Sequence, residues 1–331
     1  MNFLDEKSSA VHCLGNLALH CPGVIQPYME RIMKTLEDLS AYFHENIRYH
    51  VCLTYAQIAM GLLKNNTGKA DTDDHFFWKK GLPVQIPLPD QVSQFMDTVM
   101  YAHYFDLLQN ESNKEVVEKV LECIRDITEE MGPAGVATHL DAIVENLSIL
   151  LDKESFCQTR VKKGDTEEEQ DEDFIDSEDD EEDLDHDEII LGNVTDLIIT
   201  LSKALGDSFL PYLQKLGPKL VKYLGDEHPR SDKTMVIGCL AETFNQAPQA
   251  IEAYFNDYVK VLLQHSTSDN GSLNRNVAYG IGILAEKAST AQVTPHLQTL
   301  LQAVKTMYTN TPEEDAKDNC IATIVRFLEV H

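Results

Sequence analysis

The sequence predicts an all-α protein, and two observations carry this prediction. Apolar residues recur three and four positions apart, as in Val194, Leu197 and Leu201, which is the spacing of one face of an α-helix. No stretch alternates Val, Ile and Thr between turn residues, as a half-buried strand would. We therefore expect helices and no sheet.

The expected helices follow one another with mostly short connections. Pro or Gly stands near many of their ends, as at Pro22-Gly23, Gly132-Pro133 and Pro248, because these residues favour helix starts and stops. The predicted helices span residues 4–21, 24–40, 46–64, 90–109, 114–131, 135–152, 188–206, 208–225, 230–247, 249–266, 271–288, 292–310 and 314–330.

The chain also repeats itself. Residues 7–36 align with residues 233–262 without a gap, and GILAEK at Gly282 aligns with GCLAET at Gly238. The repeat unit is about 40 residues, longer than a TPR repeat, and antiparallel helix pairs of this length stack into a HEAT-type array. The sequence therefore predicts one continuous right-handed α-solenoid of HEAT repeats over residues 1–331, with about six to seven helix pairs.

Two connections are longer than the rest. The first, residues 65–89, is a loop insertion with three prolines and the only tryptophan of the chain, Trp78. We expect Phe76, Phe77 and Trp78 to pack back onto the solenoid, because large apolar side chains in a loop are seldom left in water. An aromatic anchor for a partner is the alternative.

The second is an acidic run, residues 165–188, in which 17 of 24 residues are Asp or Glu and none is Lys or Arg. Such dense charge repels itself, so the sequence predicts a disordered acidic loop within one repeat. The run is either a solubilising linker or an electrostatic surface for a basic partner. Thr166 and Ser177 precede acidic residues and are candidate phosphorylation sites. The acidic residues of the loop include Asp173, Asp176, Glu178, Asp179, Asp180, Glu181, Glu182 and Asp183.

Polar side chains recur on the second helix of each repeat, which lines the concave side of a HEAT solenoid. Carboxylates, amides and a tyrosine could hold a lysine, because an ammonium group needs oxygen acceptors and its stem needs an apolar wall. An ordinary solvated helix face is the alternative for any single residue. The candidates are Glu115, Glu118, Glu122, Glu129, Asn193, Asp196, Asp232, Glu242, Asn276, Tyr279, Glu286, Asp315 and Asn319.

The composition argues against several classes of function. With a net charge of −28 and only 27 dispersed Lys and Arg residues, the chain is not expected to bind nucleic acid. No apolar run approaches about 18 residues, so we expect no membrane span. No glycine-rich phosphate loop, metal-ligand spacing or catalytic motif occurs, so we expect no enzyme, cofactor or metal site. The seven cysteines never form CxxC and are expected to be buried small hydrophobes in a reducing compartment.

Several segments are characteristic in their order and spacing: DEKSSAVHCLGNLALH, AYFHENIR, LDHDEIILGNVTDLI, DKTMVIGCLAE and AKDNCIATIVRFL. Outer helices with Pro-Tyr, Arg275-Asn276 at the start of an inner helix, and an acidic loop within one repeat accompany them. Together they resemble the importin-β superfamily of karyopherins, and within it the importin four subfamily. The resemblance covers the whole chain and is to the carboxy-terminal HEAT-repeat portion of such a receptor.

The resemblance implies cargo recognition on the concave face, release by the GTPase Ran and weak passage through nuclear pore repeats. By position, it implies a lysine-binding stripe of Glu242, Asn276, Tyr279, Glu286 and Asn319. The chain has far fewer helix pairs than such receptors, so we expect a fragment. Because the repeats that hold most of the Ran contact in the family are missing, Ran is expected to bind the full-length receptor rather than this chain alone.

These observations lead to two hypotheses of different classes. The first is a monomeric fragment of a nuclear import receptor that shuttles between cytoplasm and nucleus. It would bind basic, lysine-rich localisation segments of histone H3 and H4 tails or of ribosomal proteins. The second is a histone chaperone or HEAT scaffold that shields basic proteins without transport. Both would use the same surface, so the sequence does not separate them.

Overall fold

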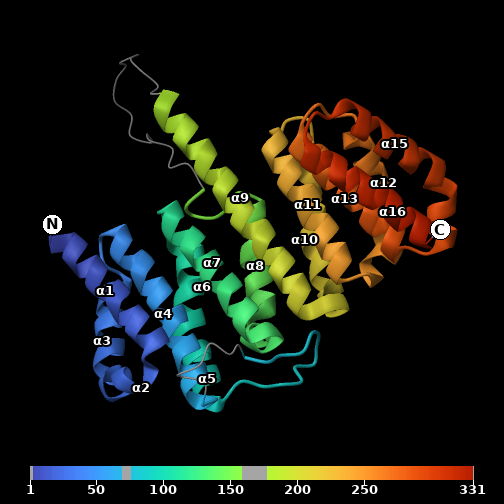
Figure 1. Ribbon diagram of the computed structural model, residues 1–331. Helices are drawn as coiled ribbons and strands as arrows, with labels where there is room; N and C mark the ends of the chain where they lie inside the picture. The colour runs from blue at the N-terminus through green and yellow to red at the C-terminus, as the bar shows by residue number, and fades with distance from the viewer. Residues whose placement is uncertain (1–2, 69–75, 159–176, 331) are drawn as a thin grey trace. The chain divides into compact units, whose positions relative to one another are not determined.

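The computed structural model in Figure 1 describes residues 3–68, 76–158 and 177–330, with the backbone alone for residues 177–186. Over these ranges the chain is helical and has no strand, as predicted. Contacts between Cα atoms divide the chain into two compact units. Unit 1 comprises Met1–Lys79 and Pro83–Leu197, and unit 2 comprises Lys80–Leu82 and Ile198–His331.

In unit 1, α1, α4 and α7 pack side by side and form what we call the inner row of this unit. The outer helices α3 and α6 pack against α4 and α7, and α8 packs against α6. The helices of unit 1 are α1 (Phe3–His20), α2 (Pro22–Ile25), α3 (Met29–Ser40), α4 (Glu45–Asn66), α5 (Asp90–Phe95), α6 (Tyr101–Asn110), α7 (Lys114–Met131), α8 (Leu140–Leu151) and α9 (Ser177–Leu205), whose last turns fall in unit 2.

Unit 2 repeats this arrangement. Its inner row is α11, α13 and α16, which pack side by side, while the outer helices α12 and α15 pack against α13 and α16. The remaining helices of this unit are α10 (Leu210–Lys222), α11 (Arg230–Gln246), α12 (Gln249–His265), α13 (Gly271–Lys287), α14 (Thr290–Val293), α15 (Leu297–Asn310) and α16 (Glu314–Val330). The pairing of inner and outer helices is the predicted HEAT-type repeat.

The apolar residues that recur at helical spacing in the sequence face the core. Val194, Leu197 and Leu201, which first indicated helix, are at most 1% exposed. Polar caps start two of the inner helices, α7 and α13: Asn113 accepts a hydrogen bond from the amide of Val116 at 3.1 Å, and Asn270 accepts one from the amide of Leu273 at 2.8 Å. These side chains satisfy amides that a helix start leaves without an intrahelical partner.

The outer helices are broken near their starts, where the sequence predicts single helices over residues 24–40 and 292–310. The 3-10 turn Gln26–Tyr28 separates α2 from α3, and the 3-10 turn Thr294–His296 separates α14 from α15. Pro27 and Pro295 lie in these turns. A proline has no amide to donate to the preceding turn, and its ring crowds that turn, so the α-helix gives way there.

The loop between α4 and α5 is non-helical over the part that the structure describes, residues 67–68 and 76–89. Trp78 packs back as predicted: its indole Nε1 donates to the carbonyl of Glu129 at 3.2 Å, and its ring lies so close to Gly132 that a Cβ there would overlap it. The amide of Phe76 also donates to Glu130 Oε1 at 3.4 Å. Phe77 differs from the prediction, because 68% of it is exposed.

The acidic run is only partly covered by the structure. Residues 165–176, with Thr166, lie outside the described residues. The expectation of disorder is wrong for residues 177–188, because α9 begins at Ser177 and not near residue 188. Acidic side chains at a helix N-terminus are stabilised by the positive end of the helix dipole, so this composition does not prevent helix formation there. Asp187 then lies 3.1 Å from Lys114 Nζ and 3.5 Å from Lys153 Nζ.

Two cysteines depart from the expectation of burial. All seven are free, and Cys13 and Cys21 are exposed, whereas the other five are buried. Cys13 lies on the solvent side of α1, and Cys21 precedes α2, where the chain turns.

One helical stretch among the described residues, Asp187–Lys222, is long and apolar enough to cross a membrane. The bent pair Lys114–Gly135 and Ala137–Leu151 passes the same test only if it counts as one span. However, 67% of the apolar window in the first stretch is buried inside the protein, as in a core helix. These helices are therefore weak evidence for a membrane span.

Candidate functional site

The inner row of unit 2 is held together through two glycines that occupy equivalent places in the repeat. A Cβ on Gly238 of α11 would lie 2.8 Å from Asn276 Nδ2 of α13. A Cβ on Gly282 of α13 would lie 2.6 Å from Arg326 Nη1 and 2.9 Å from Thr323 Oγ1 of α16. Each glycine therefore makes room for side chains of the next inner helix.

Each of these glycines is followed four residues later by a glutamate, so Glu242 and Glu286 lie on the same helix faces one turn further along. Asn276 Nδ2 donates to the carbonyl of Thr234 at 2.8 Å and joins α13 to α11. Thr323 Oγ1 donates to the carbonyl of Ala278 at 2.6 Å and joins α16 to α13. The fold thus repeats the same placement of a carboxylate along the row.

Glu242 and Tyr279 meet across α11 and α13. The Tyr279 hydroxyl is hydrogen-bonded to the Glu242 carboxylate, and Asn245 Nδ2 donates to the same hydroxyl at 3.3 Å. Burial and the neighbouring Glu242 carboxylate raise the pKa of Tyr279, so the hydroxyl stays neutral. The tyrosine ring is thereby fixed on the inner row.

The ring of Tyr279 also contacts a cationic side chain, that of Arg326. The guanidinium carbon of Arg326 lies 5.4 Å from the centroid of Tyr279, and Arg326 Nε lies 3.4 Å from Glu286 Oε2. Glu286 Oε1 also lies 2.6 Å from Lys287 Nζ. Tyr279 and Glu286 therefore form a site of the chemistry that binds a basic side chain, and in this structure the side chain is the protein's own.

The remaining predicted residues do not join this cluster. Asp232 is 6% exposed and its carboxylate lies 3.3 Å from His228 Nδ1, so it is not presented to a partner. Asn319 is half-buried on α16. Asp196 belongs to unit 1, where its carboxylate lies 3.9 Å from Arg125 Nη1. The structure thus brings together Glu242, Tyr279 and Glu286 of the predicted set, with Asn276 as a brace between helices.

Arg326, Asn245 and Lys287 are parts of this cluster that sequence reasoning missed. Arg326 follows Gly282 by 44 residues, the spacing that also separates Gly238 from Gly282. A cation at this position of the next inner helix was therefore a readable signal, because equivalent positions of successive repeats are neighbours.

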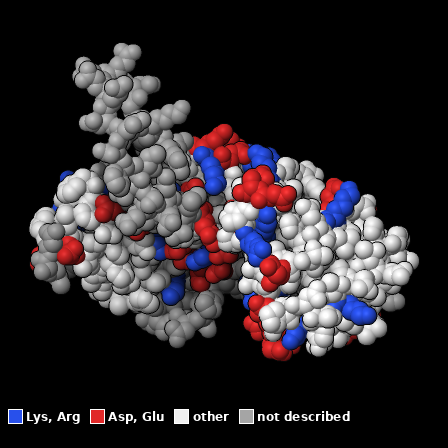
Figure 2. Space-filling view, turned by 90° about the horizontal axis from the view of Figure 1, so that it is seen from above, with Lys and Arg blue, Asp and Glu red and all other residues white. Residues whose placement is uncertain are grey.

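The inner row of unit 1 carries a mixed charge rather than a purely acidic face. Lys119 pairs with Glu122, and its Nζ lies 4.7 Å from the ring centroid of Tyr49. Burial disfavours the Lys119 ammonium, but hydrogen bonds to Glu122 and Tyr49 outweigh it and raise the pKa of Lys119. Figure 2 shows the same mixing on one face of the molecule, where acidic patches have Lys and Arg side chains among them.

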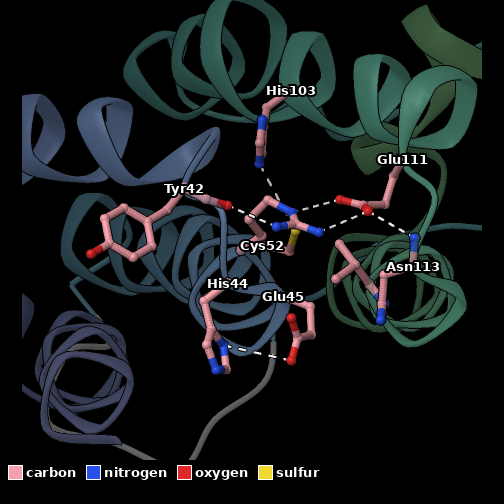
Figure 3. Close-up of polar contacts among 9 residues, drawn as sticks. Tyr42, His44, Glu45, Cys52, His103, Glu111 and Asn113 are labelled. Atoms are coloured by element: carbon pink, nitrogen blue, oxygen red, sulfur yellow. Dashed lines mark hydrogen bonds and ion pairs between the residues drawn. The ribbon is translucent and has the colours of Figure 1, made fainter. Parts of the chain in front are cut away.

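A buried ion pair in unit 1 has a different character. Arg48 Nε and Nη2 donate to the two oxygens of Glu111 at 2.7 and 2.9 Å, and Arg48 Nη1 donates to the carbonyl of Tyr42 at 2.7 Å. Glu111 also accepts a hydrogen bond from the amide of Asn113 at 2.8 Å. Figure 3 shows Tyr42, Glu111 and Asn113 around this contact. The pair links the turns that precede α4 and α7, which makes it a structural clamp.

The stacked pairs of inner and outer helices define a helical-repeat protein of the HEAT type. The family model described as importin repeat 6 matches residues 116–226. Probable importin subunit beta-4 of Schizosaccharomyces pombe is 24% identical over 323 residues, which are 98% of this chain and 29% of the relative. Importin-4 of Homo sapiens is 23% identical in an alignment 333 residues long, which covers 98% of this chain and 28% of the relative.

A solved structure shows the same fold. The crystal structure of the karyopherin Kap121p bound to the SUMO protease Ulp1p matches with a TM-score of 0.70 and 18% identity, over 99% of this chain and 28% of that chain. The chain is thus similar to importins of the importin-β type over almost its whole length. It spans less than a third of the length of these relatives.

Proposed function

We propose that this chain is part of a nuclear import receptor and that the inner row of unit 2 binds lysine-rich segments of histones or ribosomal proteins. The observation that carries the proposal is the cluster of Glu242, Tyr279 and Glu286, which already holds a cationic side chain. The two carboxylates supply oxygen acceptors, and the tyrosine ring supplies an apolar wall with a negative face.

The relatives support this proposal at the level of the whole receptor. They are importins by name, and Kap121p has been crystallised with Ulp1p and with RanGTP. Because the present chain spans less than a third of such proteins, transport of cargo, release by Ran and shuttling between cytoplasm and nucleus are proposed for the receptor as a whole.

An apolar groove on the outer side of unit 2 supports the expected contact with nuclear pore repeats. Its volume is about 280 Å³, and Val221 at its wall is 46% exposed. A phenylalanine side chain of such a repeat would bury apolar surface there. The groove is lined mainly by Leu213, Pro218, Val221, Phe244, Tyr254 and Tyr258.

Reversing the charge of Glu242 tests the proposed cargo site. Glu242→Lys removes an acceptor whose charge-assisted hydrogen bond contributes about 1.5–3 kcal/mol, and it adds a repulsive cation. We expect a fluorescein-labelled lysine-rich histone tail peptide to bind at least about tenfold more weakly, measured by fluorescence anisotropy. Helicity should not change.

The matched control is Glu252→Lys, which makes the same change of net charge at an exposed position of α12. Its affinity for the peptide should stay close to that of the wild type. An equal loss in both variants would mean that net charge alone attracts the peptide. Unaltered affinity of Glu242→Lys would move the site elsewhere, first to α7 with Glu115, Glu118, Glu122 and Glu129.

A histone chaperone or scaffold is the second candidate. The net charge of −28 and the 17 acidic residues of the run favour it, because such charge can shield a basic protein without transport. The full-length receptor separates the two: a histone tail peptide should be released by Ran loaded with GTP. Insensitivity of that binding to Ran would support the chaperone.

A further inference from the structure

Arg326 reaches from α16 to a position that α13 defines. Its Nη1 lies over Gly282, its guanidinium carbon lies 5.4 Å from the Tyr279 centroid, and its Nε lies 3.4 Å from Glu286 Oε2. Tyr279 and Glu286 are the groups to which the proposed function assigns a basic side chain of the cargo. Arg326 and that side chain would therefore occupy the same place.

The contact of Arg326 is loose compared with the clamp of Arg48. Arg48 makes two hydrogen bonds to Glu111, and the two side chains are 14% and 5% exposed. Arg326 makes one longer contact with Glu286, and these side chains are 27% and 37% exposed. Water screens an exposed pair of this kind, so it contributes little to stability, whereas a buried bidentate pair is costly to break.

Glu286 already neutralises two cations. Lys287 Nζ lies 2.6 Å from one carboxylate oxygen, and Arg326 Nε lies near the other. A third cation entering the site would be repelled unless one of the two leaves. Arg326 is the one that covers the Tyr279 ring, and its long side chain can turn into solvent without moving α16.

We propose that Arg326 is an intramolecular ligand of the cation site and that a lysine or arginine side chain of an extended basic peptide displaces it. The proposal rests on the proposed function of the same site. Arg326 would then set the affinity of the site for peptides, because a basic side chain of the peptide must compete with the Arg326 guanidinium for Tyr279 and Glu286. Peptides with few basic residues would bind too weakly to displace it. Removing the competitor should strengthen binding, although Arg326 itself touches the site.

The test compares Arg326→Gln with Lys305→Gln on the whole chain. Lys305 is exposed on the outer helix α15, so its substitution removes the same charge without uncovering Tyr279. The probe is a fluorescein-labelled peptide of alternating Lys and Gly, titrated in fluorescence anisotropy. We expect Arg326→Gln to bind the peptide about twofold to fivefold more tightly than Lys305→Gln does. The gain is small because an exposed ion pair such as Arg326–Glu286 contributes little free energy.

A melting curve of each variant separates competition from a structural role. A structural Arg326 would lower the melting temperature and leave affinity unchanged or weaker, and this outcome overturns the inference. Binding of the peptide to the wild type with no gain in Arg326→Gln over Lys305→Gln overturns the inference alone. Absence of peptide binding in every variant overturns the proposed function, and the inference with it.

Discussion

The Arg48 guanidinium donates three hydrogen bonds, two to the Glu111 carboxylate and one to the carbonyl of Tyr42. Arg48→Ala would leave the Glu111 carboxylate buried without its cation, a loss that costs about 3–5 kcal/mol in folded proteins. We expect the free energy of unfolding, measured with urea, to fall by that amount. Arg275→Ala removes an exposed arginine of α13 and should change it by less than about 0.5 kcal/mol. Similar losses in both variants would show that Arg48 is no clamp.

The same pair predicts a pH dependence of stability. Burial disfavours the Glu111 carboxylate, but hydrogen bonds from Arg48 and Asn113 outweigh it and lower the pKa of Glu111. A carboxyl group whose pKa is lower in the folded state stabilises the protein above its unfolded value of about 4.3, and this contribution is lost as pH falls through the folded pKa. The stability gap between the wild type and Glu111→Gln should therefore narrow below about pH 4.3 in urea titrations. A gap that is constant from neutral pH into acid would contradict this.

Some residues of the candidate site could be predicted from the sequence, and others could not. Glu242, Tyr279 and Glu286 could be named from recurrence on successive inner helices, because equivalent positions of stacked repeats lie side by side. Asp232 could not be excluded, since its burial against His228 depends on the turn before α11. Arg326 was missed because a positive charge was not sought on a face predicted to be acidic.

At the scale of elements, helix existence and order follow from apolar spacing, whereas helix starts depend on local chemistry. The predicted helix over residues 114–131 has the bounds of α7, where Asn113 provides a cap. The start of α9 was predicted eleven residues too late, because like-charge repulsion was given more weight than the helix dipole. The breaks at Pro27 and Pro295 lie inside apolar patterns that continue across them.

The loop between α4 and α5 gives a prediction at the same scale. Gly132 has φ +61° and ψ −145°, a conformation that only glycine adopts readily, and the Trp78 ring lies against it. Gly132→Ala should displace the ring and reduce stability by roughly 1–3 kcal/mol. Since Trp78 is the only tryptophan, its fluorescence emission should shift to longer wavelength as the indole enters water. Ala134→Gly, in the same 3-10 turn, should leave the emission unchanged.

For the whole molecule, the acidic run should affect how fast a basic cargo arrives. Charges in water are screened beyond about 8 Å at physiological salt, so we expect the charges of the run to act mainly on the association rate. Replacing residues 165–176 with Gly-Ser and the acidic residues of 177–186 with Gln keeps Asp187 and its lysine partners. Stopped-flow binding of histone dimers should become slower and less salt-dependent, while the affinity of a short tail peptide changes little. Unchanged rates at low salt would mean that the run is a solubilising spacer.

We propose that basic peptides bind the inner row of unit 2, and photo-crosslinking would show where on the chain they bind. A lysine-rich histone tail peptide with a photoreactive side chain would be irradiated with the whole chain, and its adducts mapped by mass spectrometry. The predicted adducts lie on α11, α13 and α16, near Tyr279, and disappear in Glu242→Lys but not in Glu252→Lys. Adducts confined to the outer helices α10, α12 and α15, or to α7, would contradict the claim.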